Sequence, residues 1–144
     1  MKKIFLIGLA FLVIATVIYY VRHPFGVKVE INNNVLYVDV AITNEEKELG
    51  LGNREYMESD HGMLFVYDHS EQYRYWMKNM RFPIDIIWIK DTTIVDITKN
   101  IPTETTSQLK TYTPVVPINK VLEVNAGTCD TLDINVGDAI RIRF

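Results

Sequence analysis

The chain has 144 residues, 48% of them hydrophobic, and a formal net charge of -3. These values predict one globular domain with enough apolar side chains for a core, in addition to a distinct N-terminal segment. Lys and Arg are scattered singly along the chain, so the sequence lacks the basic stripe that neutralises nucleic-acid phosphates, and we expect no nucleic-acid partner.

The N-terminal segment contains an uncharged apolar run. Residues 4–21 follow Lys2 and Lys3 and are just numerous enough to cross a bilayer as a helix. The run ends in Tyr-Tyr-Val rather than in the small residues of a signal peptidase site, which predicts an uncleaved signal anchor. The lysines favour a cytoplasmic N-terminus, so the rest of the chain is expected on the extracytoplasmic side of the cell membrane.

This segment sets the expected domain organisation. Residues 1–25 are expected to form the transmembrane helix and its connector, and residues 26–144 a single β-rich domain. A helix buried in a protein core is the alternative for the apolar run, but no polar face interrupts it. The expected partner of residues 4–21 is therefore the membrane.

Cysteine and histidine are too sparse for a redox or metal centre. Cys129 is the only cysteine, so no disulfide within the chain is possible, and we expect a packed or half-exposed thiol. His61 and His69 have no second ligand at helical or turn spacing. Glycine-rich phosphate loops and a serine nucleophile elbow are also missing, and we expect no metal and no cofactor.

The first half of the domain reads as a hairpin followed by a helix. Val27–Ile31 and Val35–Ile42 flank an Asn-Asn-Asn tripeptide, which suits the left-handed backbone angles of a hairpin loop. Thr43 stands three residues before Glu46, a capping box that predicts a short helix over residues 44–51.

The second half reads mainly as strands. Extended segments are expected at Met63–Tyr67, Tyr73–Asn79, Ile84–Ile89, Ile94–Ile101, Val121–Asn125 and Ala139–Phe144. The stretch Pro102–Pro117 lacks a clear period and is expected to be a long loop, and a helical turn is expected at Gly127–Leu132. The predicted fold is mainly β, a compact antiparallel barrel- or sandwich-like domain with one or two short helices.

The most informative run is Tyr-Trp-Met-Lys-Asn-Met-Arg-Phe-Pro-Ile-Asp, residues 75–85, because it mixes aromatic, cationic, amide and carboxylate groups between two apolar segments. On an extended backbone Trp76 and Lys78 share one face, whereas Tyr75 and Asn79 lie on the other. The proline in this run ends one strand before the next begins. One face is typical of a core and the other of a site at a hairpin end.

Four blocks in this order carry a resemblance. They are Gly62–Tyr67, Tyr75–Asn79, Pro83–Ile89 and Val121–Gly127. With them, residues 35–144 resemble the small bacterial and archaeal family called domain of unknown function 192. The resemblance implies a compact, mostly antiparallel β fold, often exported or membrane-anchored, and no established activity. The chain departs from the usual pattern at Gly52, Met80 and Trp88, where methionine, threonine and phenylalanine are common.

The candidate site residues are polar or aromatic side chains inside otherwise apolar or family-like segments. They are Arg54, Trp76, Lys78, Asn79, Asp85, Glu123 and Asn125. Asp85 and Glu123 each lie between apolar residues, so each points away from the face of its neighbours. Burying an unpaired carboxylate is costly, and we expect both to pair with Lys78 or Arg54. Such pairs are equally typical of structural salt bridges that stabilise a small barrel.

Three functions remain open on this evidence. The first is a membrane-anchored binding module that presents Trp76, Lys78, Asn79 and Asp85 to a polar small molecule, glycan or peptide. The second is a small envelope hydrolase or lyase that uses Asp85 or Glu123 as general base, with a nearby cation stabilising negative charge. The third is a structural accessory protein.

Overall fold

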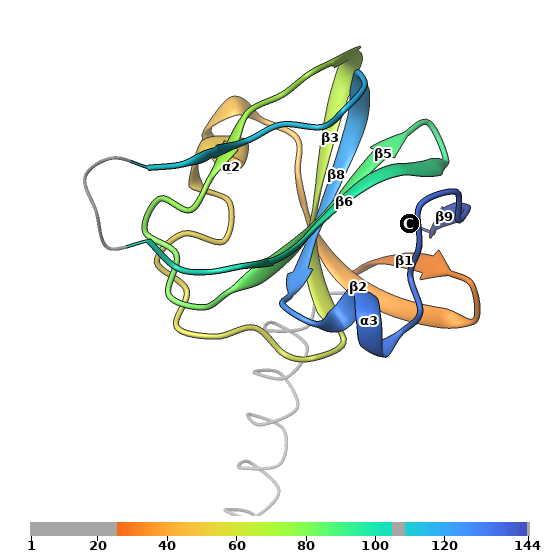
Figure 1. The fold of residues 1–144 in the computed structure, drawn as a ribbon, viewed down its shortest axis with the longest axis horizontal. Helices are drawn as coiled ribbons and strands as arrows, with labels where there is room; N and C mark the ends of the chain where they lie inside the picture. The colour runs from red at the N-terminus through yellow and green to blue at the C-terminus, as the bar shows by residue number, and fades with distance from the viewer. Residues whose placement is uncertain (1–25, 105–108, 144) are drawn as a thin grey trace, which may run out of the picture.

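The computed structural model describes residues 26–104 and 109–143 (Figure 1). The predicted membrane anchor, residues 4–21, lies outside these residues. Within the described ranges, no helix combines the length and the apolar character needed to cross a membrane.

Most of the described chain forms one seven-stranded sheet, with the strand order β6-β5-β8-β3-β2-β1-β9. Its strands are β1 (Val27–Ile31), β2 (Asn34–Ala41), β3 (His61–Glu71), β5 (Ile84–Lys90), β6 (Thr93–Ile101), β8 (Ile118–Asn125) and β9 (Ile140–Arg143). A second sheet contains β4 (Tyr75–Trp76) and β7 (Thr111–Tyr112), and the short helices are α2 (Asn44–Leu49) and α3 (Thr128–Thr131). The prediction of a mainly β domain with one or two short helices is confirmed.

The large sheet curls until its two edge strands meet at one end. Thr93, at the start of β6, forms an isolated antiparallel bridge with Ala139, just before β9. The N–H of Ile94 also donates to the carbonyl of Asp138 at 2.9 Å. The domain is therefore a half-barrel, which agrees with the barrel-like part of the prediction.

One strand pair contradicts the prediction of an antiparallel fold. β2 and β3 run parallel, with Tyr37 opposite His61 and Ala41 opposite Phe65. Parallel neighbours cannot be joined by a tight hairpin and need a crossover, which residues 42–60 provide. The predicted antiparallel hairpins β1–β2 and β5–β6 are confirmed.

The crossover begins with α2, whose start is fixed by its own sequence. The Thr43 hydroxyl accepts from the N–H of Glu46, and the Glu46 carboxylate accepts from the N–H of Thr43, so the predicted capping box is present. The helix ends at Leu49 rather than at the predicted residue 51. Gly50 follows with a φ of 52°, a left-handed angle that glycine adopts easily.

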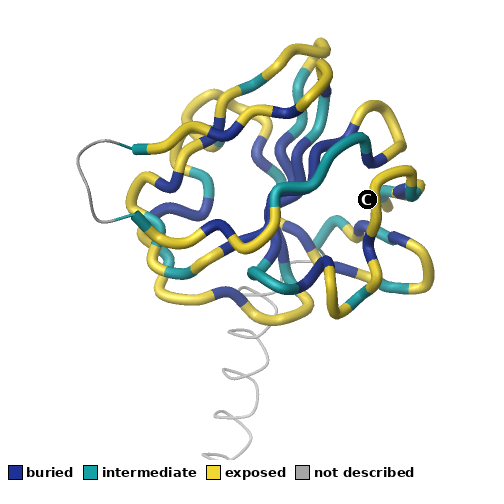
Figure 2. Tube along the Cα trace, viewed as in Figure 1, coloured by how far each residue is buried: buried dark blue, intermediate teal, exposed yellow. Residues whose placement is uncertain are grey.

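The two faces of the large sheet are covered by two separate apolar clusters. One cluster joins residues from both sheet edges, among them Val29 and Ile94, with Leu122 and Val124 of β8, so it fills the inside of the curl. The other lies on the opposite face, includes Val121, and is covered by the crossover and the β4–β7 pair. Figure 2 shows the buried central strands and the exposed loops around them.

Two segments differ from the predicted strands. The segment 73–79 contains only the two-residue strand β4 and ends in a turn at residues 78–79, where Asn79 has a φ of 59°. The expected long loop 102–117 contains β7, whose Tyr112 pairs with Tyr75. This pairing brings a distant part of the chain beside β4.

Candidate functional site

A pocket of about 300 Å³ opens on the outer face of the sheet, beside α2. Its walls come from α2 and the turn after it, from β3, from β4 with the loops on either side of it, and from β8. The lining residues are Lys47, Glu48, Leu49, Gly50, Leu51, Gly52, Phe65, Tyr67, Arg74, Tyr75, Trp76, Lys78, Met80 and Glu123. Three of the predicted site residues, Trp76, Lys78 and Glu123, therefore meet at one cavity.

Two loops form part of the pocket rim and touch through their backbones. The N–H of Asn53 donates to the carbonyl of Asn79 at 2.9 Å, and both asparagines have positive φ angles, 66° and 59°. Gly52 leaves no space for a side chain, because an added Cβ would lie 2.8 Å from the carbonyl oxygen of Leu49 and 3.3 Å from that of Lys78. The close contact fixes the positions of both loops.

Glu123 lies at the floor of the pocket. On β8 it lies opposite Met63 of β3 and Ile86 of β5, which belong to the outer apolar cluster. Glu123 is 5% exposed and has no hydrogen bond or salt bridge to any residue that the structure describes. Among the described residues, every polar side-chain atom that is fully enclosed has a hydrogen-bond partner. The carboxyl oxygens of Glu123 have none, so they are not fully enclosed and border the open pocket.

The environment of Glu123 favours its neutral form. Burial raises the pKa of Glu123 from 4.5 to about 8, and the positive charge of Arg54 opposes part of this rise. Arg54 does not pair with Glu123 directly, because its Nη1 donates to the Asp39 carboxylate at 2.7 Å. At neutral pH Glu123 is therefore mostly protonated and able to donate a hydrogen bond.

Aromatic side chains form one wall beside Glu123. The hydroxyl groups of Tyr67 and Tyr75 are hydrogen-bonded at 2.8 Å, and the ring of Phe65 meets that of Tyr75 edge to face at 5.2 Å. Tyr67 also stacks on Tyr73, with ring centroids 3.5 Å apart. Burial raises the pKa values of Tyr67 and Tyr75, so both keep their hydroxyl protons.

Three cations surround the mouth of this pocket. Lys47 places its Nζ 4.5 Å from the centre of the Tyr67 ring, and Arg74 and Lys78 flank the 43% exposed Trp76 in the sequence. None of the three has a carboxylate within salt-bridge distance in the part of the chain that the structure describes. The pocket therefore combines a neutral acid at its floor with unpaired positive charges at its mouth.

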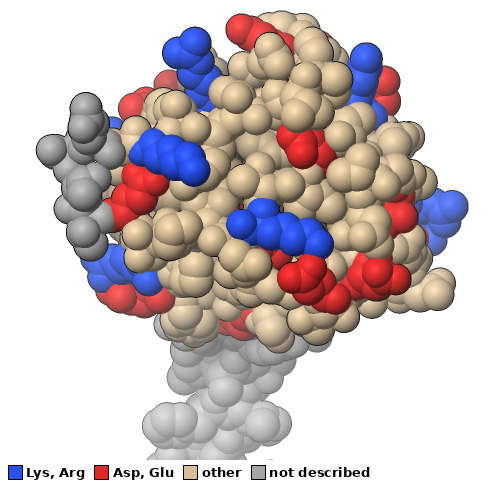
Figure 3. All heavy atoms as spheres, viewed as in Figure 1, with Lys and Arg blue, Asp and Glu red and all other residues tan. Residues whose placement is uncertain are grey.

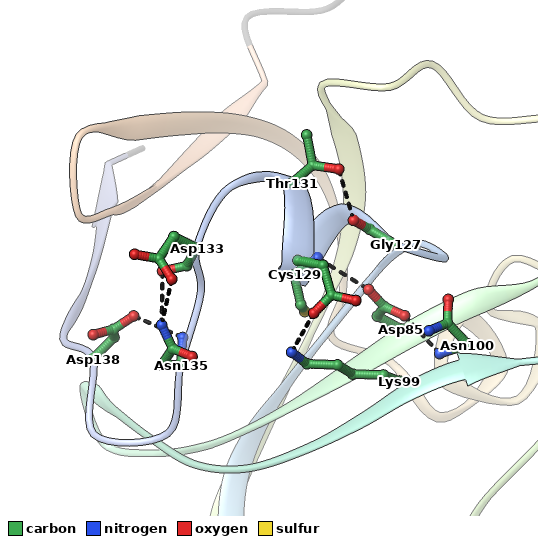
Figure 4. Close-up of polar contacts among 10 residues, drawn as sticks. Asp85, Lys99, Asn100, Gly127, Cys129, Thr131, Asp133, Asn135 and Asp138 are labelled. Carbon is green, nitrogen blue, oxygen red and sulfur yellow. Dashed lines mark hydrogen bonds and ion pairs between the residues drawn. The ribbon is translucent and has the colours of Figure 1, made fainter.

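Asp85 lies opposite Val124 of β8, a residue of the inner cluster, so it faces the other side of the sheet and does not line the pocket. Figure 4 shows it beside Asn100 and Cys129. It is fully buried, and its two carboxylate oxygens accept the N–H groups of Asn100 at 2.8 Å and Cys129 at 3.0 Å. The expectation that Asp85 pairs with Lys78 or Arg54 is wrong, because backbone donors from β6 and α3 take that role. Asp85 joins β5 to these two elements.

The thiol of Cys129 belongs to the same structural cluster. Cys129 is buried, as the sequence allowed, and burial together with the neighbouring Asp85 carboxylate raises the pKa of its thiol to about 12. The exposed Lys99–Asp130 ion pair, at 2.6 Å, lies close enough to this cluster to act on the Cys129 thiol through its charges. A thiol held neutral in this way is a poor nucleophile.

The two asparagines of the predicted site have structural contacts. The Asn125 side chain donates to the carbonyls of Met57 and Glu58, both at 3.0 Å, and so fastens the end of the crossover to β8. Asn79 shapes the pocket rim through its backbone carbonyl. Of the seven predicted residues, three line the pocket, Asn79 forms part of its rim, Arg54 acts on Glu123 through its charge, and Asp85 and Asn125 lie outside.

Sequence reasoning missed several residues of the pocket. Arg74 carried a usable signal, because it precedes Trp76 and Lys78 with the same two-residue spacing and shares their exposed side. Lys47 carried none, since it reaches the pocket only through the parallel crossover. Tyr67 ends the apolar segment Met63–Tyr67, whose pattern predicts a strand and gives no sign of a site.

The described residues contain no cluster that could hold a metal ion, and the face drawn in Figure 3 has no strongly charged stripe. No three of their His, Cys, Asp and Glu side chains are grouped so that they could hold a metal ion. On the face shown in Figure 3, basic and acidic side chains are intermixed. The pocket is thus the feature that carries the functional argument.

Comparisons with known proteins agree with this fold. A protein of Sinorhizobium meliloti 1021 described as a "putative transcription regulator" has a solved structure with 32% identity and a TM-score of 0.70, covering 81% of this chain and 91% of its own. A protein of unknown function from Novosphingobium aromaticivorans DSM 12444 has 26% identity and a TM-score of 0.73, covering 79% of this chain and 83% of its own.

The search of curated proteins found no match. Residues 27–142, nearly the whole described domain, match the family described as "DUF192: Uncharacterized ACR, COG1430". The chain therefore belongs to the DUF192 family.

Proposed function

We propose that the domain binds a small polar molecule in the pocket above Glu123. The observation that carries this proposal is a nearly buried carboxyl group without a partner at the floor of an open cavity. A buried polar group is normally satisfied within the fold, as Asp85 is, because an unsatisfied one reduces stability. A ligand that supplies the missing hydrogen bonds explains why such a group is kept.

The other walls of the pocket support a binding role. A volume of about 300 Å³ lies at the small end of ligand sites, which combine apolar and aromatic walls with a few polar groups. Phe65, Tyr67 and Tyr75 provide the apolar surface, and Trp76 lies at the edge, where it can cover a bound ring. The cavity is too small for a folded partner and suits a metabolite, a single sugar or a peptide end.

The test is a thermal-shift screen of the full-length chain in mild detergent against amino acids, sugars, sugar acids and short peptides. A ligand should raise the melting temperature of the natural protein, because it binds only the folded state. The shift should vanish for Glu123→Gln and persist for Glu58→Gln, a matched change at an exposed residue outside the pocket. A ligand that stabilises Glu123→Gln equally would contradict the proposal, and an absence of any ligand would favour the accessory role.

A second candidate function is acid–base catalysis by Glu123. A pKa of about 8 suits a group that must gain and lose a proton near neutral pH. Asp85 is not retained as a base, since both of its oxygens already accept backbone hydrogen bonds. An envelope hydrolase or lyase of this kind would turn over a screened ligand, and Glu123→Gln would abolish turnover. Binding without turnover would exclude this candidate for that ligand.

We also propose that residues 4–21 anchor the domain in the cell membrane, with the pocket on the extracytoplasmic side. The support is the uncharged run behind Lys2 and Lys3. Alkaline phosphatase fused after Phe144 should be active, and a matched fusion to a reporter that works only in the cytoplasm should be silent. The opposite pattern would overturn the proposed orientation.

The name of the Sinorhizobium neighbour does not change this proposal. A transcription regulator that contacts DNA needs a surface that neutralises phosphates. The net charge of -3 and the intermixed charges of the face shown in Figure 3 do not favour such a surface here. We therefore keep the expectation of no nucleic-acid partner.

A further inference from the structure

We infer that the ligand is a small zwitterion, whose amine reaches Glu123 at the pocket floor and whose anionic group reaches the cations Lys47, Arg74 and Lys78 at the pocket mouth. This inference rests on the proposed binding function and adds the class of ligand. Two separate observations carry it, one at each end of the cavity.

A positive or hydrogen-bond-donating group would satisfy the floor of the pocket in the ionised form of Glu123. Glu123 has no hydrogen bond or salt bridge among the described residues, and Arg54, whose charge acts on it, is held by Asp39 at 2.7 Å. An ammonium group would form a charge-assisted hydrogen bond with the ionised carboxylate and offset the cost of its burial. The Tyr67 and Tyr75 hydroxyls lie on the same side and can accept further hydrogen bonds from that ammonium.

The aromatic wall also accepts cations. Lys47 already places its Nζ 4.5 Å from the centre of the Tyr67 ring, the arrangement of a cation–π contact. The opposite face of that ring is covered by Tyr73. The Tyr67 ring thus tolerates a positive charge beside it, but Lys47 and Tyr73 already occupy its faces, so a ligand amine must be held by the Glu123 carboxyl and the tyrosine hydroxyls.

The mouth of the pocket requires negative charge. Lys47, Arg74 and Lys78 line it without a salt bridge among the described residues, and Glu48 is the one acid beside them. Most other described Arg residues are paired, for example Arg81 with Glu55. A carboxylate or phosphate at the mouth would meet several donors at once.

A simple anion and a simple cation each match the two ends less well. An anion could accept a hydrogen bond from neutral Glu123, but it would offer nothing to the ionised carboxylate and would be repelled by it. A cation without an anionic group would have to settle beside three like charges. A molecule with both groups separated by a short spacer satisfies the floor and the mouth together.

The inference fixes the sign of the pH dependence. The charged or titratable groups that face Glu123 and the pocket are Arg54, Tyr67, Tyr75, Lys47, Glu48, Arg74 and Lys78. An amine pairs best with ionised Glu123, so affinity should rise as the pH increases toward 8, and binding at pH 7 should release a proton. An anionic ligand that accepts a hydrogen bond from neutral Glu123 should show the opposite trend.

The test uses isothermal titration of the full-length chain with matched probes at pH 6.0, 7.0 and 8.0. The probes are 4-(aminomethyl)benzoate, 4-methylbenzoate, which lacks the amine, and 4-methylbenzylamine, which lacks the carboxylate, together with linear ω-amino acids of two to eight carbons. The proteins are the natural chain, Glu123→Gln, Lys78→Ala and, as a control for a lysine outside the pocket, Lys90→Ala.

The inference expects at least one amino acid probe to bind tenfold or more tightly than either of its single-charge controls. Its affinity should rise about tenfold from pH 6.0 to 8.0, and its heat should depend on the buffer because a proton is released. Glu123→Gln should lose the preference for the amine, Lys78→Ala should weaken the preference for the carboxylate, and Lys90→Ala should change neither.

Two results would overturn the inference. Equal binding of 4-methylbenzoate and 4-(aminomethyl)benzoate that weakens as the pH rises would establish an anion site, and the proposed binding function would stand. Failure of every amino acid probe to bind would also overturn the zwitterion, and the wider thermal-shift screen would then decide the proposed function separately.

Discussion

Two buried carboxyl groups lie on neighbouring strands of the same sheet and have opposite surroundings. Asp85 on β5 faces the inside of the curl, is 0% exposed and accepts two backbone N–H groups. Glu123 on β8 faces the outer side, is 5% exposed and has no hydrogen bond among the described residues. The strand register places Ile86 opposite Glu123, and Asp85 is the residue before Ile86. The two carboxyl groups are therefore neighbours in the sheet but point to opposite faces of it.

The difference separates a carboxylate that the fold satisfies from a carboxyl group that the described fold leaves without a partner. Both residues are buried, and both interrupt apolar strands. Two backbone N–H groups donate to Asp85 in place of the water that it loses on burial, and these charge-assisted hydrogen bonds stabilise the native state. No described residue supplies Glu123 with hydrogen bonds in place of those lost with water, so its carboxyl group is available to a ligand or a proton.

The largest effect is expected from Asp85→Ala. Two buried N–H groups would lose a charged acceptor, each at a cost of about 2–3 kcal/mol, so the free energy of unfolding should fall by about 5 kcal/mol. Urea denaturation followed by circular dichroism measures this loss, with Asp130→Ala as the control at an exposed neighbour. A stability equal to that of the control would mean that Asp85 does not hold β6 and α3 in place.

The pH dependence of Glu123 comes next. The unfolded chain releases this proton near pH 4.5, whereas the folded protein keeps it to about pH 8, so the folded state binds more protons between these values. Stability should therefore fall by about 3 kcal/mol between pH 5 and 8, relative to Glu123→Gln, which cannot titrate. Urea midpoints of both proteins across this range measure the difference. Parallel curves would show that Glu123 is ionised in the folded state.

A smaller effect is expected from Gly52→Ala at the pocket rim. The new Cβ would lie 2.8 Å from the carbonyl oxygen of Leu49, so one of the rim loops must move, at a cost of about 2 kcal/mol. The same movement should displace Lys78 and weaken ligand binding. Thermal unfolding and a repeat of the ligand titration measure the two effects. Unchanged binding in a destabilised variant would separate the rim geometry from recognition.

The smallest effect is expected from Lys99→Ala, which removes the ion pair beside the Asp85 cluster. The pair is exposed, and exposed pairs contribute little because water and salt screen them. The urea midpoint should stay within the error of the natural protein at 0.15 M salt. A clear loss would indicate that Lys99 supports Asp85 electrostatically, and that the Asp85 cluster extends to the surface.

The sequence predicted those elements whose causes are local. The α2 capping box depends on Thr43 and Glu46, three residues apart, and the hairpins depend on adjacent strands and their turns. The parallel placement of β2 and β3 depends on where a long crossover returns, for which no short-range pattern exists. That one connection also decides whether Lys47 reaches the pocket.

The roles of the two carboxylates could not be told apart from the sequence. Asp85 and Glu123 have the same apolar flanks, and alternation correctly predicts that each leaves the face of its neighbours. The deciding contacts come from the backbones of Asn100 and Cys129, which lie 15 and 44 positions away from Asp85. Every residue type except proline has a backbone N–H group, so the sequence does not indicate which residues donate to Asp85. Its hydrogen-bond partners could be identified only from the folded structure.

The pairing of β1 with β9 has a consequence for how the chain folds. Lys28 lies opposite Arg143 and Ile31 opposite Ile140, so strands from the two ends of the domain sequence must find each other. Contacts of such high sequence separation form slowly, because a long loop must be closed first. During synthesis β1 can pair with β2 early, but its second edge stays open until β9 has left the ribosome. Nascent chains that stall before β9 would therefore expose an unpaired strand edge and depend on chaperones to stay soluble.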